Sequence, residues 1–306
     1  MHLRQDMFRS LIFVPSNSEK YINKAKTLNA DIVCFDLEDS VPNSQKDLAR
    51  QLIKSALTAR TTYQARNVYA RINSFDSGMT SDDLKAVVQK GIDGIILPKV
   101  GNDEEVSAVD RILSTLEQEK GFQEKSIRIA ASIESAKGVV NSYSIAKASD
   151  RVNMLVFGIF DFLYDMHLDY EEGNNEFECI YARSKIPVDA RAAGVEAIDG
   201  IWQKLDDAEG LKKDATIAKR LGYSGKSLIH PNQIEAVHTI FAPSANEIEW
   251  ATKVVRALDE ALENGRGKGA IKIEGKMIDA VHYKQAKAIL DGANKSKNHN
   301  FQNTKN

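Results

Sequence analysis

Short apolar runs recur along the chain as far as residue 231, and amphipathic stretches separate most of them. Eight runs are predicted to be buried strands: Ser10–Val14, Asp31–Leu37, Val68–Ile72, Gly94–Leu97, Ile127–Ile133, Asn153–Phe157, Val195–Ile198 and Ser227–Ile229. The stretches with helical periodicity between them are Glu19–Leu28, Gln45–Ala59, Ser81–Lys90, Asp103–Glu119, Ala136–Ala148, Val188–Ala193 and Ala208–Leu221. This alternation predicts an α/β protein with a parallel sheet and helical crossovers.

The number of strand–helix units predicts how this sheet closes. Eight units within roughly 250 residues are typical of a (β/α)₈ TIM barrel. A doubly wound open sheet is the alternative, but no glycine-rich dinucleotide loop follows the first strand. Residue parity also favours the barrel, because Ala130, Ser132 and Glu134 share one face of a strand, opposite its isoleucines. That face would look into the barrel and carry polar groups to its upper rim.

The pattern changes after Pro231. A long amphipathic helix, a glycine-rich loop, a short strand and a final helix are predicted at Asn246–Asn264, Gly265–Ala270, Ile271–Glu274 and Tyr283–Leu290. None of these is needed to close a barrel. We therefore expect a catalytic barrel domain over residues 1–240, a C-terminal helical extension over 241–292 that acts as a lid or an oligomer contact, and a disordered polar tail over 293–306.

Composition narrows the class of protein. The 306 residues are 42% hydrophobic and 27% charged with a net charge of −2, so bulk charge attracts neither nucleic acid nor an anionic membrane. No apolar run is long enough to span a bilayer, and the N-terminus lacks the apolar core of a secretory signal. Cys34 and Cys179 are distant from each other and have no neighbouring histidine, which indicates reduced packing thiols in a cytoplasmic protein.

Two of the predicted strands end on a carboxylate. The stretch Ile127–Glu134 ends on Glu134, and Met154–Asp161 ends on Asp161. Because parallel strand ends meet on one rim, these side chains could converge on a single divalent cation. Mg²⁺ is usually held by one or two protein carboxylates, with water and substrate in the other positions, and Mn²⁺ is the alternative metal. The structural alternative is that Glu134 caps the helix beginning near Ala136 while Asp161 bonds loop amides.

Asp36, Glu38 and Arg71 are candidate catalytic residues. Asp36 and Glu38 are two residues apart at the end of the second strand, so both face the same side and could hold metal-bound waters or orient a basic residue. Arg71 lies on the polar face of the third strand, where its guanidinium could bind a substrate carboxylate in bidentate fashion. The alternatives are a turn-forming acidic cluster and an internal ion pair of Arg71 with Asp36 or Glu38.

Lys99 and His230 also lie at predicted strand ends. A Schiff-base role for Lys99 is conceivable, but a charge that balances the surrounding carboxylates is the preferred interpretation, and we count Lys99 among the candidate substrate-binding residues. His230-Pro231 could supply a ligand or a base, or could shape its loop. The basic run Arg266–Lys268 could meet phosphates, although a solvated loop is the default interpretation.

Nine short segments also occur in a characteristic order. They are Arg9–Pro15, Phe35–Val41, Ala70–Asn73, Leu97–Lys99, Ala131–Ser135, Phe157–Asp161, Ala190–Gly194, Ile229–Pro231 and Glu274–Asp279. In this order they resemble the citrate lyase β-subunit-like family, part of the HpcH/HpaI aldolase group that includes citryl-, citramalyl- and malyl-CoA lyases. Each segment alone is weak evidence, whereas nine in register, between about Arg9 and Leu290, are strong evidence of family.

The resemblance implies a (β/α)₈ barrel that forms a homotrimer or hexamer and binds Mg²⁺ at its upper rim. It implies Glu134 and Asp161 as metal ligands and Arg71 as the group that holds the carboxylate of the oxo-acid fragment. Asp279, on the C-terminal extension, would be an acid/base group that reaches the active site of a neighbouring subunit. The residues implied to lie near the coenzyme A moiety are Phe13, Lys24, Ile229 and Pro231.

The expected activity is therefore the Mg²⁺-dependent cleavage of a 3-hydroxy-carboxyacyl-CoA, such as malyl-, citramalyl- or citryl-CoA, to a 2-oxo acid and an acyl-CoA. The reverse reaction would form the same thioester by Claisen condensation. Two alternatives are a citrate lyase β subunit that acts on an acyl-carrier-protein thioester, and a CoA-independent, metal-dependent hydroxy-oxo-acid aldolase. A non-catalytic subunit would predict loss of the metal or anchor residues, yet all are present. Many family members have Gly-Ala-Glu-Asp where this chain has Gly158–Asp161, so Phe160 is expected to reshape the acid pocket.

Overall fold

The computed structural model describes residues 8–169, 177–263 and 269–303, with side chains as far as residue 294. The chain divides into two compact units, Met1–His238 and Thr239–Asn306. This division falls beside residue 240, where the sequence pattern placed the end of the barrel domain.

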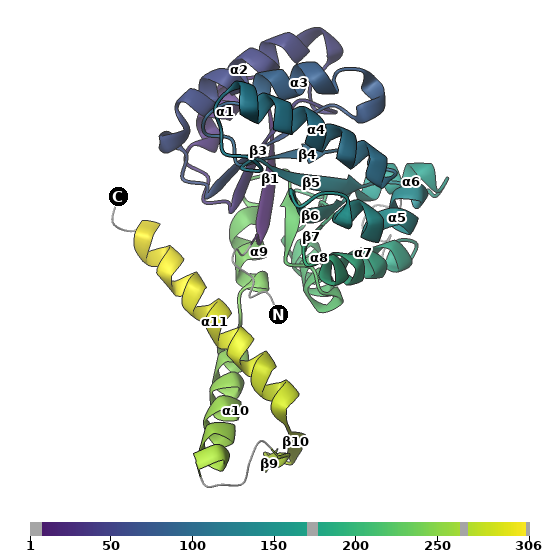
Figure 1. Ribbon diagram of the computed structural model, residues 1–306. Helices are drawn as coiled ribbons and strands as arrows, with labels where there is room; N and C mark the ends of the chain where they lie inside the picture. The colour runs from purple at the N-terminus through teal and green to yellow at the C-terminus, as the bar shows by residue number, and fades with distance from the viewer. Residues whose placement is uncertain (1–7, 170–176, 264–268, 304–306) are drawn as a thin grey trace. The chain divides into compact units, whose positions relative to one another are not determined.

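Within the described residues, the first unit is a closed barrel of eight parallel strands that pair in chain order, with β8 returning to β1 (Figure 1). The strands are β1 (Ser10–Pro15), β2 (Ile32–Asp36), β3 (Asn67–Arg71), β4 (Gly94–Leu97), β5 (Arg128–Ile133), β6 (Val152–Phe157), β7 (Glu196–Asp199) and β8 (Gly225–Leu228). Each begins and ends close to its predicted bounds. The prediction of a (β/α)₈ barrel is confirmed.

Helices alternate with these strands and form an outer ring around them (Figure 1). They are α1 (Glu19–Ala25), α2 (Lys46–Thr58), α3 (Thr80–Val87), α4 (Asp103–Glu119), α5 (Ala136–Lys147), α6 (Ile159–Asp165), α7 (Ile180–Ala193), α8 (Ala208–Leu221) and α9 (Gln233–Phe241). Three differ from prediction. The short helices α6 and α9 were not predicted, and α7 begins at Ile180 rather than Val188. Pro187 lies inside α7 and is buried, so its packing offsets the helical hydrogen bond that a proline cannot make.

The barrel interior is filled by apolar side chains at alternate positions of successive strands. This cluster consists of Phe8, Leu11, Ile32, Cys34, Tyr69, Ile96, Ala130, Met154, Val156 and Ile198, with Phe13 packed against it. On β3 and β5 the next inward positions beyond the cluster are Arg71 and Ser132, because side chains alternate along a strand. Polar groups therefore begin where the apolar filling ends, at the carboxyl ends of the strands.

A buried ionic group ties the outer helices to the barrel. Arg183 of α7 donates two hydrogen bonds to Asp199 at the end of β7, at 2.9 and 2.7 Å, and Lys226 of β8 contacts the same carboxylate at 2.7 Å. Asp214 of α8 pairs with both cations. Burial alone would raise the pKa of Asp199, but Arg183 and Lys226 outweigh it and hold that pKa below its usual value. This group fixes α7 and α8 against their strands.

After α9, the described residues of the second unit form two helices and a small hairpin. They are α10 (Ala245–Glu263), the antiparallel pair β9 (Ile271–Ile273) and β10 (Lys276–Ile278), and α11 (Ala280–Asn303). The predicted long helix and short strand are confirmed, while the loop residues 264–268, including Arg266–Lys268, lie outside the described residues. The sequence analysis expected a disordered tail over residues 293–306, but α11 continues to Asn303, and residues 304–306 lie outside the described residues. A polar composition does not by itself end a helix, and no glycine or proline follows Gly292.

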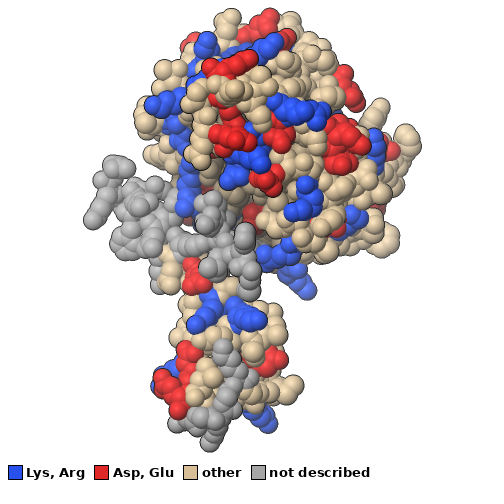
Figure 2. Space-filling model, viewed as in Figure 1, with Lys and Arg blue, Asp and Glu red and all other residues tan. Residues whose placement is uncertain are grey.

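The surface of the molecule matches its near-neutral charge. On the face shown in Figure 2, basic and acidic side chains are interspersed over the barrel unit, with no extended area of one sign. Among the helices in the described ranges, none combines the length and the apolar character that crossing a bilayer requires.

Candidate active site

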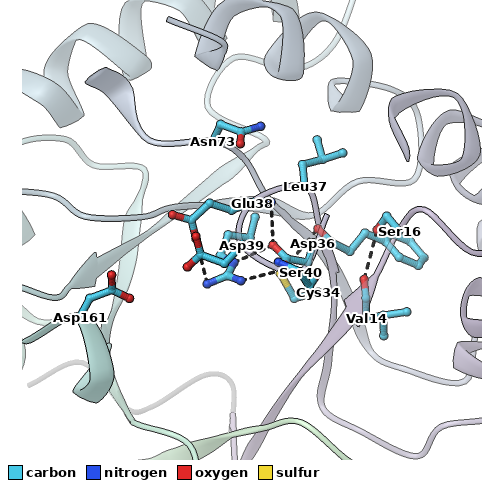
Figure 3. A network of polar contacts seen from close by, with 12 residues as sticks. Val14, Ser16, Cys34, Asp36, Leu37, Glu38, Asp39, Ser40, Asn73 and Asp161 are labelled. Carbon is cyan, nitrogen blue, oxygen red and sulfur yellow. Dashed lines mark hydrogen bonds and ion pairs between the residues drawn. The ribbon is translucent and has the colours of Figure 1, made fainter. Parts of the chain in front are cut away.

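The pair formed by Asp36 and Arg71 anchors the upper rim of the barrel. Nε and Nη2 of Arg71 donate to the two oxygens of Asp36, each at 2.7 Å, across neighbouring strands β2 and β3. The same carboxylate accepts hydrogen bonds from the backbone of Glu38 and from the backbone and hydroxyl of Ser40 (Figure 3). Burial would raise the pKa of Asp36, but these donors outweigh it and lower that pKa. Both oxygens of Asp36 bind Arg71, so the role of Asp36 is to position that guanidinium.

Two further contacts fix the Arg71 guanidinium. Its Nη1 pairs with Glu38 at 3.0 Å, and its central carbon stands 4.6 Å above the ring of Phe13. Burial would lower the pKa of Arg71, but the carboxylates of Asp36 and Glu38 raise it, so the side chain stays charged. The predicted internal ion pair is confirmed. A guanidinium carries five N–H groups, so donors remain for a bound anion.

Lys99 lies just after β4 and meets three carboxylates. Its Nζ is 2.8 Å from Glu38, 3.3 Å from Asp39 and 3.5 Å from Asp161. Figure 3 shows Asp161 on a separate segment facing Glu38 and Asp39. Burial would lower the pKa of Lys99, but the hydrogen bond with Glu38 and the charges around it raise that pKa. An ammonium so strongly protonated is a poor Schiff-base nucleophile, which supports the charge-balancing interpretation.

Glu134 directly follows β5 and is buried, with 4% of its surface exposed. A β-carbon on Gly158, the residue after β6, would stand 2.5 Å from Glu134 Cγ, so glycine leaves the space that this side chain occupies. The structural alternative for Glu134 is wrong, since Ser135 caps α5 by accepting a hydrogen bond from the backbone of Gly138 at 3.0 Å. The Glu134 carboxyl is thus not engaged in capping.

The electrostatics of this rim fit a divalent cation. Burial, followed by the nearby carboxylates of Glu38 and Asp161, raises the pKa of Glu134 to about 7. A bound cation would relieve that repulsion, and hard oxygen donors are what Mg²⁺ prefers. In the described part of the chain, no three His, Cys, Asp or Glu side chains form a closed metal cluster. Glu134 and Asp161 could therefore hold a cation only in an open site that water or substrate completes.

A buried lysine that the sequence analysis passed over supports the loop after β2. Lys46 Nζ donates to the carbonyl oxygens of Leu37 and Glu38, the latter at 2.8 Å, and to the side chain of Asn73 at 2.7 Å. A signal was available in the sequence, because Lys46 lies at helical spacing on the buried stripe of α2 with Ala49, Ile53 and Leu57. A cation on an apolar stripe points to buried acceptors.

The loop after β8 is braced by another unpredicted residue. Gln233 is buried, and its side-chain oxygen accepts from the backbone of Ile229 at 3.1 Å and of His230 at 3.3 Å. Its amide donates to the carbonyl of Trp202, after β7, at 3.0 Å. The ring of His230 accepts from the backbone of Asn232, which agrees with the loop-shaping interpretation. These bonds fix the loop that carries Ile229 and Pro231.

The structure gathers most, but not all, of the candidates. Phe13 joins the Arg71 group at the rim, whereas Lys24 lies exposed on α1. Asp279 belongs to the second unit, where it precedes α11 and accepts hydrogen bonds from the backbone of Val281 and His282. Its Oδ1 is also 2.7 Å from the His282 ring, and these bonds lower the pKa of Asp279. In its own chain, Asp279 is an N-terminal helix cap.

Comparisons with known proteins decide the family. The model of the HpcH/HpaI aldolase/citrate lyase family matches residues 9–231, and the model of the C-C bond lyase of the TIM-barrel fold matches residues 174–295. The chain belongs to the HpcH/HpaI aldolase/citrate lyase family. It is accordingly a carbon–carbon lyase on a TIM barrel, as the order of its nine segments indicated.

The chain is also similar to individual relatives over most of its length. The chain is 37% identical to the citrate lyase subunit beta of Leuconostoc mesenteroides subsp. cremoris, over 94% of this chain and 93% of the relative. It is 31% identical to a (3S)-malyl-CoA thioesterase of Cereibacter sphaeroides, over 92% and 93%. Among solved structures, the Mycobacterium tuberculosis CitE in complex with magnesium, acetoacetate and coenzyme A is similar with a TM-score of 0.77 and 25% identity, covering 94% of this chain and 98% of that one.

Proposed function

We propose that this family member is an Mg²⁺-dependent lyase that cleaves a 3-hydroxy-carboxyacyl-CoA, or forms it by Claisen condensation. The products of cleavage are a 2-oxo acid and an acyl-CoA, and malyl-, citramalyl- and citryl-CoA are the candidate substrates. The observation that carries the proposal is the grouping of Glu134, Asp161 and Arg71 on one rim of the barrel, linked through Glu38 and Lys99. TIM-barrel enzymes place catalytic groups on that rim.

Glu134 and Asp161 would hold the metal, with Mn²⁺ as an alternative to Mg²⁺. When bound, the cation supplies Lewis-acid stabilisation of the developing negative charge on the substrate oxygen. Arg71 would bind the carboxylate of the oxo-acid fragment through the N–H groups that Asp36 and Glu38 leave free. Asp36 prevents the guanidinium from turning, so this anion site is preorganised rather than formed on binding.

Cleavage requires a base that removes the proton of the substrate hydroxyl. Of the two carboxylates after β2, Glu38 suits this role better, because burial raises its pKa whereas that of Asp36 is lowered. A base whose pKa lies nearer the working pH transfers protons more effectively. Glu38 also contacts Arg71 and Lys99, so a proton arriving there changes the charge balance of the whole rim.

Asp279 would supply the second proton-transfer group at the site of a neighbouring subunit in a homotrimer or hexamer. Its lowered pKa makes it a carboxylate near neutral pH, ready to remove a proton from the acyl thioester in the condensation direction. In the cleavage direction it must first take up a proton before it can protonate the enolate. The two free, buried cysteines fit a reducing compartment, and we place the enzyme in the cytoplasm.

The coenzyme A moiety would cross the rim where β8 and β1 adjoin. These strands pair, so the loop carrying Ile229 and Pro231 lies beside the strand that carries Phe13, and α1 with Lys24 follows that strand. Lys99 would meet the substrate from the side of β4. The coenzyme A in the similar M. tuberculosis CitE supports a CoA thioester as the substrate.

A second candidate is the β subunit of a citrate lyase complex, acting on an acyl-carrier-protein thioester. The 37% identity to the Leuconostoc citrate lyase subunit beta favours it. The two candidates share the rim chemistry and differ in the carrier of the acyl group. A CoA-independent aldolase is the third candidate. In such an enzyme, Ile229 and Pro231 after β8 would have no coenzyme A to bind.

One assay separates these candidates. Purified full-length protein is incubated with Mg²⁺ and one of a panel of substrates: malyl-, citramalyl- or citryl-CoA, a citryl-carrier-protein thioester, or free hydroxy-oxo acids. Release of glyoxylate, pyruvate or oxaloacetate is followed, with EDTA as a control. We expect metal-dependent release from one thioester and its loss in Glu134→Gln and Asp161→Asn, but not in Asp150→Asn, whose carboxylate is exposed.

The other outcomes of the assay are equally informative. Release only from a citryl-carrier-protein thioester would assign the citrate lyase β subunit. Release only from free hydroxy-oxo acids would assign an aldolase. Metal-independent release, unaffected by both rim variants, would contradict the proposed site.

A further inference from the structure

Lys99 has a backbone conformation that lysine rarely adopts. Its φ is +55°, in the left-handed region, directly after the strand β4 and Pro98. A residue with a β-carbon is strained there and persists only where the surroundings hold it. In this conformation the Lys99 Nζ reaches Glu38, which follows β2, and Asp161, which lies in the first turn of α6 after β6.

These carboxylates do not hold the ammonium equally. Glu38 is nearest, at 2.8 Å, followed by Asp39 at 3.3 Å and Asp161 at 3.5 Å. Glu38 is almost fully buried, whereas 40% of the Asp161 side chain is exposed. Asp39 is more exposed still, at 56%. The contact with Asp161 is nevertheless the longest of the three and far more solvated than that with Glu38, so a cation that binds Asp161 has only a weak ion pair to displace.

We propose that Lys99 sets the metal affinity of the rim by competing with the divalent cation for Asp161. The inference rests on the proposed function, in which Glu134 and Asp161 are the metal ligands. Two positive charges cannot share one carboxylate without repulsion, so the cation must take Asp161 from the ammonium, which keeps Glu38 and Asp39. Lys99 thus lowers metal affinity and neutralises the rim carboxylates when the metal leaves.

The test is Mg²⁺ binding to the purified full-length chain, measured by titration calorimetry. Lys99→Met keeps the length of the side chain and removes the charge, so it should bind Mg²⁺ at least about tenfold more tightly than the unmodified protein. Lys99→Arg retains the charge and should not. A matched control is Lys125→Met, because Lys125 also has a left-handed backbone, with φ +58°, and pairs with a carboxylate, Asp150, at 2.9 Å.

Thermal unfolding gives a second readout that does not depend on calorimetry. Without Mg²⁺, Lys99→Met should melt at a lower temperature, because three carboxylates lose their counter-ion, and saturating Mg²⁺ should raise its melting temperature more than that of the unmodified protein. Equal or weaker Mg²⁺ binding by Lys99→Met would overturn the proposal, provided that Asp161→Asn weakens binding. If Asp161→Asn leaves Mg²⁺ binding unchanged, the proposed metal site fails and the role of Lys99 fails with it.

Discussion

Gly158 lies so close to Glu134 that a β-carbon at position 158 would stand 2.5 Å from Glu134 Cγ and 2.7 Å from Cδ. The two residues follow neighbouring strands, β5 and β6, and the missing side chain of one makes room for the carboxyl of the other. Gly158 therefore does more than follow a strand, because its lack of a side chain makes room for the strongest candidate for a metal ligand.

Gly158→Ala should displace the Glu134 carboxyl and weaken Mg²⁺ binding by about tenfold or more, since a misplaced ligand loses its geometry. Titration calorimetry with Mg²⁺ measures the effect. Gly101→Ala is the matched control, because its added β-carbon would meet the flexible side chain of Lys137 at 3.2 Å, which can move away. Equal Mg²⁺ affinity in both variants would show that Glu134 needs no such space.

Asp36→Asn should damage both stability and activity. The substitution removes half of a buried, bidentate ion pair and leaves Arg71 undercompensated, which typically costs about 3–5 kcal/mol of unfolding free energy. Urea unfolding measures this loss, and kinetics with the substrate identified by the thioester assay should show a raised KM, because Arg71 is no longer held. Asp47→Asn is the control, since Asp47 pairs with Arg50 at the surface. A fully active and stable Asp36→Asn would contradict the positioning role.

The Asp199 group should make stability depend on acid pH. The folded-state pKa of Asp199 is lowered, so its contribution is present above the unfolded value of about 3.9 and is lost as the pH falls through the lower folded value. Asp199→Asn should reduce the unfolding free energy at pH 7 by about 3–5 kcal/mol and flatten its decline below about pH 4. Urea unfolding between pH 3 and 7 tests this. Asp150→Asn, at an exposed carboxylate, should leave the acid limb nearly unchanged.

Mixing two inactive variants tests whether Asp279 acts across subunits. Glu134→Gln lacks a proposed metal ligand and Asp279→Asn lacks the proposed proton-transfer group, so each alone should be inactive. If each site combines Glu134 of one chain with Asp279 of another, subunits exchanged at equal amounts should recover about a quarter of full activity, because the two intact residues meet in about one site in four. No recovery after proven exchange would place Asp279 with its own barrel or outside the site.

The sequence predicts some features of the fold and the site but not others. Strand parity correctly placed Ser132 and Arg71 on the inner face, because alternation along a strand is local. The start of α7 was missed because Pro187 is tolerated through burial, which is a tertiary effect. The end of α11 was missed because polarity alone does not stop a helix. Lys46 and Gln233 were missed because each binds an acceptor on a distant segment, Asn73 for Lys46 and the carbonyl of Trp202 for Gln233.

The sequence by itself determined the barrel, its strand ends and the residue types on the rim, since these follow from periodicities of a few residues. Only the tertiary structure decided how those residues divide their roles. It showed that Asp36 is hydrogen-bonded to Arg71, that Ser135 caps α5 in place of Glu134, and that Lys99 contacts Asp161. The physical reason is that hydrogen bonds and ion pairs are settled by distances of a few ångströms across strands, which spacing along the chain does not encode.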